Sequence, residues 1–348
     1  MAKPREVAIV FRSRPAWRWL APAVAAVVVV GGGAAAGTIV ANADPSLPAR
    51  SAEQLLADLR NTDVDGLVGT IVQSAELGIP GTGGNGPGAA ADLAALFAGI
   101  TTARIWHAPG ARDRLALLGP QGETDLIRNG SDLWVWNSID KKANHLNLPA
   151  RRAEPGRADP AAVDLTTGVT TTGAVTVAGR DAYELVLRPK DAASLIGQVR
   201  LAIDAGTHIP LRVDVYARNA TNPAFRLAFQ QISYTVPDHE QFAFNPPPGT
   251  TVIEADAEVA KPAGSLSVVG SGWTSVVTAR LPDPRQLAGA IGGLPRVSGS
   301  WGSGRLFAGV LFSVLVTDDG RVFAGAVIPA KLYAAAGGRP CSAASATC

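Results

Sequence analysis

The hydrophobic pattern is most informative at Leu133-Trp134-Val135-Trp136, a run that is apolar at every position. Successive side chains of a β-strand point to opposite faces, so Leu133 and Val135 share one face and Trp134 and Trp136 share the other. Such a strand cannot have one face on a core and the other in water. The sheet is therefore covered on both sides, or one of its faces looks into an apolar cavity.

Short β-type segments surround this run, with turn signals at short intervals. Asn129-Gly130 is the dipeptide expected in a two-residue type I′ hairpin, because both turn positions need positive φ. Strands are predicted at residues 66–74, 101–107, 112–118, 124–128, 133–137, 141–146, 174–177, 183–188, 198–203, 209–216 and 225–234. Their spacing predicts a meander that curls into a barrel.

Apolar side chains at helical spacing predict short helices. Ser51 and Gln54 form a capping box, so an amphipathic helix is expected over residues 52–60. A short helix is expected over 160–165, with Pro160 at its first position. Another is expected over residues 92–100, where the apolar side chains at helical spacing are Leu93, Leu96, Phe97 and Ile100.

A smaller unit is predicted after these strands. Three prolines within residues 242–252 cannot donate ladder hydrogen bonds, so the chain should leave the sheet there. Residues 254–266 are expected to be a linker. The last part should be a small α+β domain over 267–336, with strands at 273–281, 306–316 and 321–327, a hairpin turn at Asp319-Gly320, and helices at 284–291 and 329–336. Residues 337–348 form a tail of small residues.

Charge is placed unevenly at the N-terminus. The first 18 residues are basic, and an uncharged apolar run follows over residues 19–40. Ala41-Asn42-Ala43 then offers a small-x-small cleavage site before Asp44, which is a signal-peptide layout, although an uncut run of this length could also anchor the chain. With either outcome the rest of the chain is expected outside the cytoplasm. The net charge is only +2, so nothing favours a nucleic-acid partner.

Residues for catalysis or metal binding are sparse. The four histidines lack the spacing of metal ligands, and no Walker A, no G-x-S-x-G and no G-x-G-x-x-G after a strand is present. The Gly-rich stretch 81–88 holds no Lys and is followed by Ala, so it is expected to be a flexible loop and not a phosphate site. We therefore expect no enzyme, no metal and no cofactor. Cys341 and Cys348 lie in the tail, where they could form a disulfide in an oxidising compartment or remain free thiols.

Three stretches resemble the LolA/LolB-like superfamily, which includes LppX/LprG-type proteins and the N-terminal half of MucB/RseB. The first is ARIWHAP at 103–109, followed by the "LW" run that ends at Trp136. The second joins LRPKD at 187–191, RLAID at 200–204 and IPLR at 209–212. The third is residues 242–252. The resemblance covers about residues 51–252 and suggests an actinobacterial envelope protein.

The resemblance implies a mainly β fold with some α: an unclosed antiparallel β-barrel over residues 44–253, with residues 92–100 and 160–165 as lid helices. Ala108 stands where Gram-negative carriers have a basic residue, so a lid latch of that type is not implied. The implied cavity would be lined by Ile71, Val72, Leu93, Leu96, Phe97, Trp106, Trp134, Trp136, Phe225 and Phe229. A filled core is an equally open interpretation of the tryptophans.

The function expected from this resemblance is non-catalytic binding of a lipid or an acylated lipoprotein, for carriage or envelope homeostasis. The alternative is a sensor like MucB/RseB that acts on a membrane anti-sigma factor. A third possibility is a structural envelope protein with a filled core. The expected partners are acyl chains and, in the sensor alternative, a membrane protein.

Overall fold

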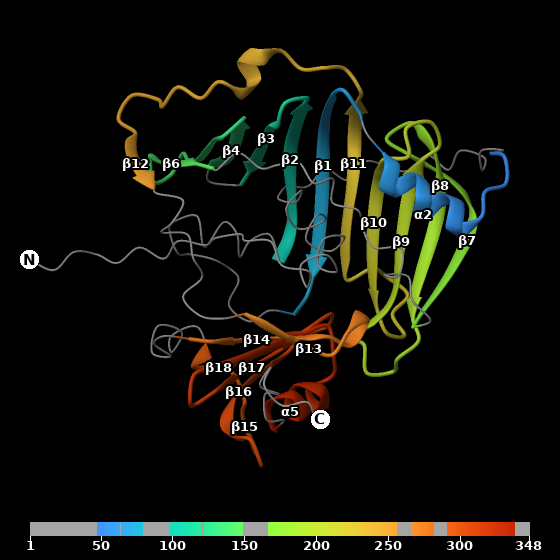
Figure 1. Ribbon diagram of the computed structural model, residues 1–348, viewed down its shortest axis with the longest axis vertical. Coiled ribbons are helices and arrows are strands. Elements are labelled where there is room, and N and C mark those ends of the chain that lie inside the picture. The colour runs from blue at the N-terminus through green and yellow to red at the C-terminus, as the bar shows by residue number, and fades with distance from the viewer. Residues whose placement is uncertain are drawn as a thin grey trace, which may run out of the picture.

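The computed structural model describes residues 47–62, 64–78, 98–119, 122–148, 166–255, 266–281 and 291–337. These residues form two β-sheets and a few short helices (Figure 1). The larger sheet has 12 strands in the order β12-β6-β5-β4-β3-β2-β1-β11-β10-β9-β8-β7, and the smaller has six in the order β13-β14-β18-β17-β16-β15. The fold is therefore mainly β with some α, as predicted.

The large sheet is antiparallel except where β12 pairs in parallel with β6. Its strands are β1 (Leu67–Glu76), β2 (Ala98–Ala108), β3 (Arg112–Leu118), β4 (Glu123–Asn129), β5 (Asp132–Asn137), β6 (Lys142–Asn147), β7 (Thr167–Val177), β8 (Arg180–Pro189), β9 (Ile196–Asp204), β10 (Pro210–Ala217), β11 (Phe225–Ser233) and β12 (Thr251–Ala255). The edge strands β12 and β7 do not pair with each other. The prediction of an unclosed antiparallel sheet is confirmed.

The helix α2 (Ala52–Asn61) begins at the predicted capping box. The Ser51 hydroxyl accepts from the Gln54 N–H, and the Gln54 side chain accepts from the Ser51 N–H. Leu55 is fully buried and packs with Tyr183 and Leu185 of β8. The helix therefore lies over strands β7 to β9 and covers one face of the sheet there (Figure 1).

The connection from β11 to β12 passes over the ends of strands β1 to β4, at the top of Figure 1. It contains the 3₁₀ turn η2 (His239–Phe242) and then the prolines at 246–248, where the chain is outside the sheet as predicted. The chain then rejoins the sheet as β12. The expectation of a linker is therefore wrong for Glu254 and Ala255, because both pair with β6.

The small sheet contains β13 (Ser267–Val269), β14 (Val276–Arg280), β15 (Arg296–Gly299), β16 (Gly302–Ala308), β17 (Ser313–Thr317) and β18 (Arg321–Gly325), with η3 (Gly272–Thr274) before β14 and α5 (Pro329–Gly337) packed on the sheet. The single strand predicted over 306–316 is wrong. Gly309 donates its N–H to the Phe312 carbonyl and turns the chain between β16 and β17. The turn predicted at Asp319-Gly320 is confirmed, since Gly320 has φ 83° and donates to Thr317.

Two other local predictions need correction. The β4–β5 turn consists of Gly130 and Ser131, since Asn129 pairs with Asp132, and of these two only Gly130 has positive φ. Residues 98–100 belong to β2 rather than to a helix, because their backbone pairs with residues 74–76 of β1. The rest of that predicted helix, the predicted helix at 160–165, most of the one at 284–291, residues 1–43, Cys341 and Cys348 lie outside the described residues.

The two sheets are joined by backbone hydrogen bonds and by shared apolar packing. Leu195 N–H donates to Ala326 O and Ile328 N–H donates to Ala193 O, both at 2.9 Å. Leu311, in the turn between β16 and β17, is buried in the same apolar cluster as Leu77, which follows β1. The smaller sheet thus lies at the end of the large sheet toward which β1 runs (Figure 1). The predicted division into separate domains stays a prediction.

Candidate ligand-binding face

One face of the large sheet is lined by aliphatic side chains from strand to strand. Ile105, Leu115, Leu126 and Val135 are successive cross-strand partners on β2 to β5. We call this side the apolar face. By strand pairing, its apolar members on β1 to β6 and β11 are Leu67, Ile71, Ala75, Ala103, Ile105, Leu115, Leu117, Leu126, Leu133, Val135, Leu146, Phe225, Leu227 and Phe229.

Burial changes along the apolar face. Ile71 is 1% exposed and Leu117 is 6% exposed, so the face is well covered at these positions of β1 and β3. Leu126, Leu133 and Val135 are only half-buried. Each square ångström of apolar surface removed from water contributes about 25 cal/mol. An apolar ligand that covers the β4–β6 side of the face would therefore gain binding free energy by removing this surface from water.

Polar side chains bound this face at both ends of the strands. At one end His107 pairs with Asp113 at 2.7 Å. At the other end the Asn137 amide donates to the Thr124 hydroxyl at 2.9 Å. An apolar surface rimmed by polar groups is typical of a site that takes an apolar ligand or partner.

The opposite side of the sheet carries the three predicted tryptophans, and we call it the tryptophan face. Trp106 is buried, with the guanidinium carbons of Arg104 and Arg114 at 4.9 and 5.1 Å from its ring centroid. It packs with Phe242 of the β11–β12 connection. Trp134 stacks on His145, with ring centroids 4.1 Å apart. These aromatic side chains hold the β11–β12 connection on the sheet.

Charged groups also lie on the tryptophan face. Arg226 donates to both carboxylate oxygens of Asp214, at 2.5 and 3.0 Å, and this hydrogen bonding raises the pKa of Arg226. Arg114 donates to Asp125 at 2.6 Å. Burial raises the pKa of Glu123, and the nearby Asp125 carboxylate raises it further. These ion pairs make this face far less suited to an acyl chain than the apolar face.

The predicted lining residues are not brought together. Ile71, Phe225 and Phe229 lie on the apolar face. Leu93, Leu96 and Phe97 lie outside the described residues. The predicted residues on the tryptophan face are Val72, Trp106, Trp134 and Trp136. The expected single lining is thus split by the pleat of the sheet, since successive residues of a strand point to opposite faces and cannot line one cavity.

Sequence reasoning missed most of the apolar face. Ile105, Leu115, Leu126 and Leu146 were not among the expected lining residues, although each belongs to a predicted strand. The signal that could have found them is the alternation itself. Leu133 and Val135 define one face of β5, and a meander with short turns carries that face to its neighbours.

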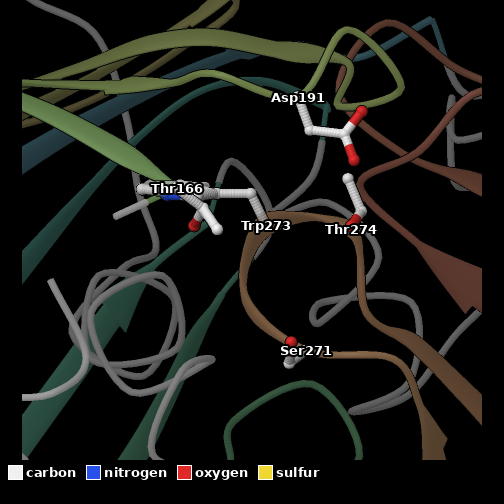
Figure 2. A pocket seen from close by; sticks show the side chains of 5 residues that line it. All are labelled: Thr166, Asp191, Ser271, Trp273 and Thr274. Atoms are coloured by element: carbon white, nitrogen blue, oxygen red, sulfur yellow. The ribbon is translucent and has the colours of Figure 1, made fainter. Parts of the chain in front are cut away.

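A small cavity lies where the two sheets meet (Figure 2). It is lined by Thr166, Asp191, Ser271, Trp273 and Thr274 and has a volume of about 40 Å³. The Trp273 indole N–H donates to the Thr167 hydroxyl at 2.8 Å beside it. This volume suits one or two water molecules, whereas sites for drug-sized ligands start near ~300 Å³.

Two features sought in the sequence were also sought in the structure. Across the described ranges, no three His, Cys, Asp or Glu residues are grouped so that they could hold a metal ion. No helix in the described part of the chain is both long and apolar enough to cross a membrane.

No protein-family model and no curated protein matches the sequence. Solved structures do match. The MucA/MucB complex of Pseudomonas aeruginosa matches at 19% identity and a TM-score of 0.47, over 82% of this chain and 96% of that chain. A LolA superfamily protein from Nitrosomonas europaea matches at 13% identity and a TM-score of 0.20, over 56% of this chain and 99% of that chain. The lipoprotein LppX of Mycobacterium tuberculosis matches at 10% identity and a TM-score of 0.29, over 50% and 92%. The matches thus include the kinds of protein that the sequence resembles.

Proposed function

We propose that this protein is a non-catalytic binding protein that holds the acyl chains of a lipid, or of a lipid-modified protein, on its apolar face. The observation that carries the proposal is the row Ile105, Leu115, Leu126 and Val135, which crosses four strands without a polar interruption. Covering such a row with an acyl chain contributes about 0.8 kcal/mol per buried CH₂ group. Binding of this kind needs no catalytic residue.

We further propose that the protein works outside the cytoplasm, against a lipid-containing envelope. Support comes from the basic start of the sequence and the apolar run at residues 19–40. The chain would then serve lipid carriage or envelope homeostasis.

The test is to identify what the protein carries when it is purified from its native envelope. Mass spectrometry of an organic extract should find one acyl lipid per chain, and a fluorescent fatty acid should compete with that lipid in solution. An extract without lipid, together with no binding of the fluorescent fatty acid by delipidated protein, would overturn the proposal.

A second candidate function is a sensor that reports lipid or misfolded lipoprotein to a membrane anti-sigma factor. The favouring observation is that the apolar cluster of β1 and β11 continues into the smaller sheet through Leu77 and Leu311. A ligand on the apolar face could therefore alter how the smaller sheet packs. Binding of the purified extracytoplasmic part of such a factor should then change when lipid is added, and binding indifferent to lipid would argue against the sensor.

A further inference from the structure

His145 on β6 lies between two carboxylates that come from different strands. Its Nδ1 atom is 2.8 Å from Oε2 of Glu254 on β12, and its Nε2 atom is 3.2 Å from Oδ1 of Asp132 on β5. The imidazole ring also stacks on Trp134, with the two ring planes 10° from parallel. Both ring nitrogens therefore face a carboxylate oxygen, while the ring itself is held on the tryptophan face.

This arrangement suits only the doubly protonated form of the ring. An ionised carboxylate accepts hydrogen bonds and donates none. A neutral imidazole donates from one nitrogen and presents a lone pair on the other, so one of the two carboxylates would face that lone pair. The imidazolium form donates from both nitrogens and carries the opposite charge, so it satisfies Asp132 and Glu254 together.

The other groups around His145 do not offset these two charges. On its own strand the nearest residues of the same face are Ala143 and Asn147, and both are uncharged. Across the described residues, neither Asp132 nor Glu254 forms an ion pair with a lysine or an arginine. His145 is therefore the cation that these two carboxylates share.

The strand that His145 ties down is a short one at the edge of the sheet. β12 has five residues, and β6 is its neighbour among the described strands. Glu254 is the direct cross-strand partner of His145 in this parallel pair. β12 also ends the β11–β12 connection, whose Phe244 contacts Trp134 and Trp136. The ion pair thus joins the end of the connection to the strand beside those tryptophans.

We propose that protonated His145 is a latch that holds β12, and through it the β11–β12 connection, on the tryptophan face, and that loss of one ring proton loosens this latch. The inference does not depend on lipid binding. Histidine is the side chain whose charge ordinarily changes between about pH 5 and 8. The connection is therefore held more firmly in a mildly acidic medium. Phe242 is buried against Trp106 at the other end of the connection, so the β12 end opens first.

Hydrogen exchange of the full chain at pH 5.5 and pH 8 tests the latch, with each rate corrected for the intrinsic pH dependence of amide exchange. The Thr251 N–H donates to the Lys141 carbonyl at 2.8 Å, so its protection reports the closed position of β12. In the wild type this protection should fall about threefold to tenfold from pH 5.5 to pH 8, which is the effect of losing solvent-exposed ion pairs. His145→Gln should show no such fall.

Two further variants make the test specific. Glu254→Gln keeps the histidine and removes one carboxylate, and because Glu254 is largely exposed this variant should fold and show a weaker pH dependence. His239→Gln is the matched control, since His239 lies on η2 of the same connection and should leave the fall as in the wild type. Wild-type protection that is equal at both pH values, or a fall that persists in His145→Gln, would overturn the latch. A fall of the same size in β8 and β9 would also overturn it, because the loss would then be global.

Discussion

At the scale of single residues, Trp134 and Val135 are neighbours on β5 with opposite roles. Trp134 stacks on His145 and contacts Phe244, with ring centroids 4.1 and 5.1 Å away. Val135 is a half-buried member of the apolar face. Val135→Glu should therefore reduce lipid affinity at least tenfold and cost about 1 kcal/mol of stability, because a half-buried charge keeps access to water.

Trp134→Ala is the paired control for that change. It removes ring contacts that hold the β11–β12 connection, so it should cost about 3 kcal/mol of unfolding free energy and leave lipid affinity unchanged. Fluorescent fatty-acid titration and chemical denaturation of both variants make the comparison. The reverse pattern would place the ligand on the tryptophan face.

A second residue-scale prediction concerns Gly69 of β1. A Cβ atom at this position would lie 2.6 Å from Cε1 and 2.9 Å from Cδ1 of the Phe229 ring. The ring must then shift within the packed apolar cluster, so Gly69→Ala should destabilise the protein by about 1–3 kcal/mol. Chemical denaturation measures this loss.

Gly168→Ala on β7 controls for the glycine substitution itself. Its nearest atom would be 3.7 Å away, which is ordinary contact, and no such loss is expected there. Equal losses at both positions would show that the Phe229 ring is not the cause.

At the scale of elements, local patterns predicted most strands of the large sheet. Capping at Ser51 and the alternation on β4 and β5 are properties of adjacent residues, and both were found. The parallel pairing of β12 with β6 could not be predicted, because its partners are more than 100 residues apart. The split of 306–316 was missed because Gly309 turns a stretch that is apolar apart from Ser313.

The turn between β9 and β10 yields a prediction about pH. Asp204 is fully buried, and burial opposes its ionisation. Hydrogen bonds from Arg180 and from the N–H groups of Gly206 and Thr207 outweigh this, so its pKa lies below the usual value. A carboxyl with a lowered folded pKa stabilises the fold above its unfolded pKa of about 4 and loses that effect as pH falls further.

Asp204→Asn should therefore lower the unfolding free energy at pH 7, and the difference from wild type should shrink below about pH 4. Chemical denaturation at pH 7 and pH 3 measures both differences. The exposed Asp65→Asn is the control. A deficit of the same size at both pH values would show that hydrogen-bond geometry, and not the charge of Asp204, stabilises this turn.

At the scale of the whole molecule, the two sheets share apolar packing. Leu311 and Phe312, in the turn between β16 and β17, join the cluster that contains Ile71 and Phe225 of the larger sheet. Leu311→Ala should therefore lower the stability of both sheets together, by about 2–4 kcal/mol. Calorimetry should show one unfolding transition that moves as a unit. Two transitions, with only the one from the smaller sheet shifted, would contradict this coupling.

The candidate site could be predicted only in part. The sequence indicates that β5 is apolar on both sides, and it places Phe225, Leu227 and Phe229 on one face. It does not reveal which side of β5 continues the side of β11, because that depends on pairings through β1 to β4. Those pairings put Trp134 and Phe229 on opposite faces.

The central claim is that an acyl chain lies on the apolar face, and photo-crosslinking tests it most directly. A diacylglycerol with a diazirine in its acyl chain would be bound to the full chain, irradiated, and mapped by tandem mass spectrometry. The account predicts labels on apolar-face residues such as Leu115, Leu126 and Val135, and their loss when unlabelled lipid competes. Labels on Trp106, Trp134 or Trp136 instead, or labels that competing lipid does not reduce, would contradict it.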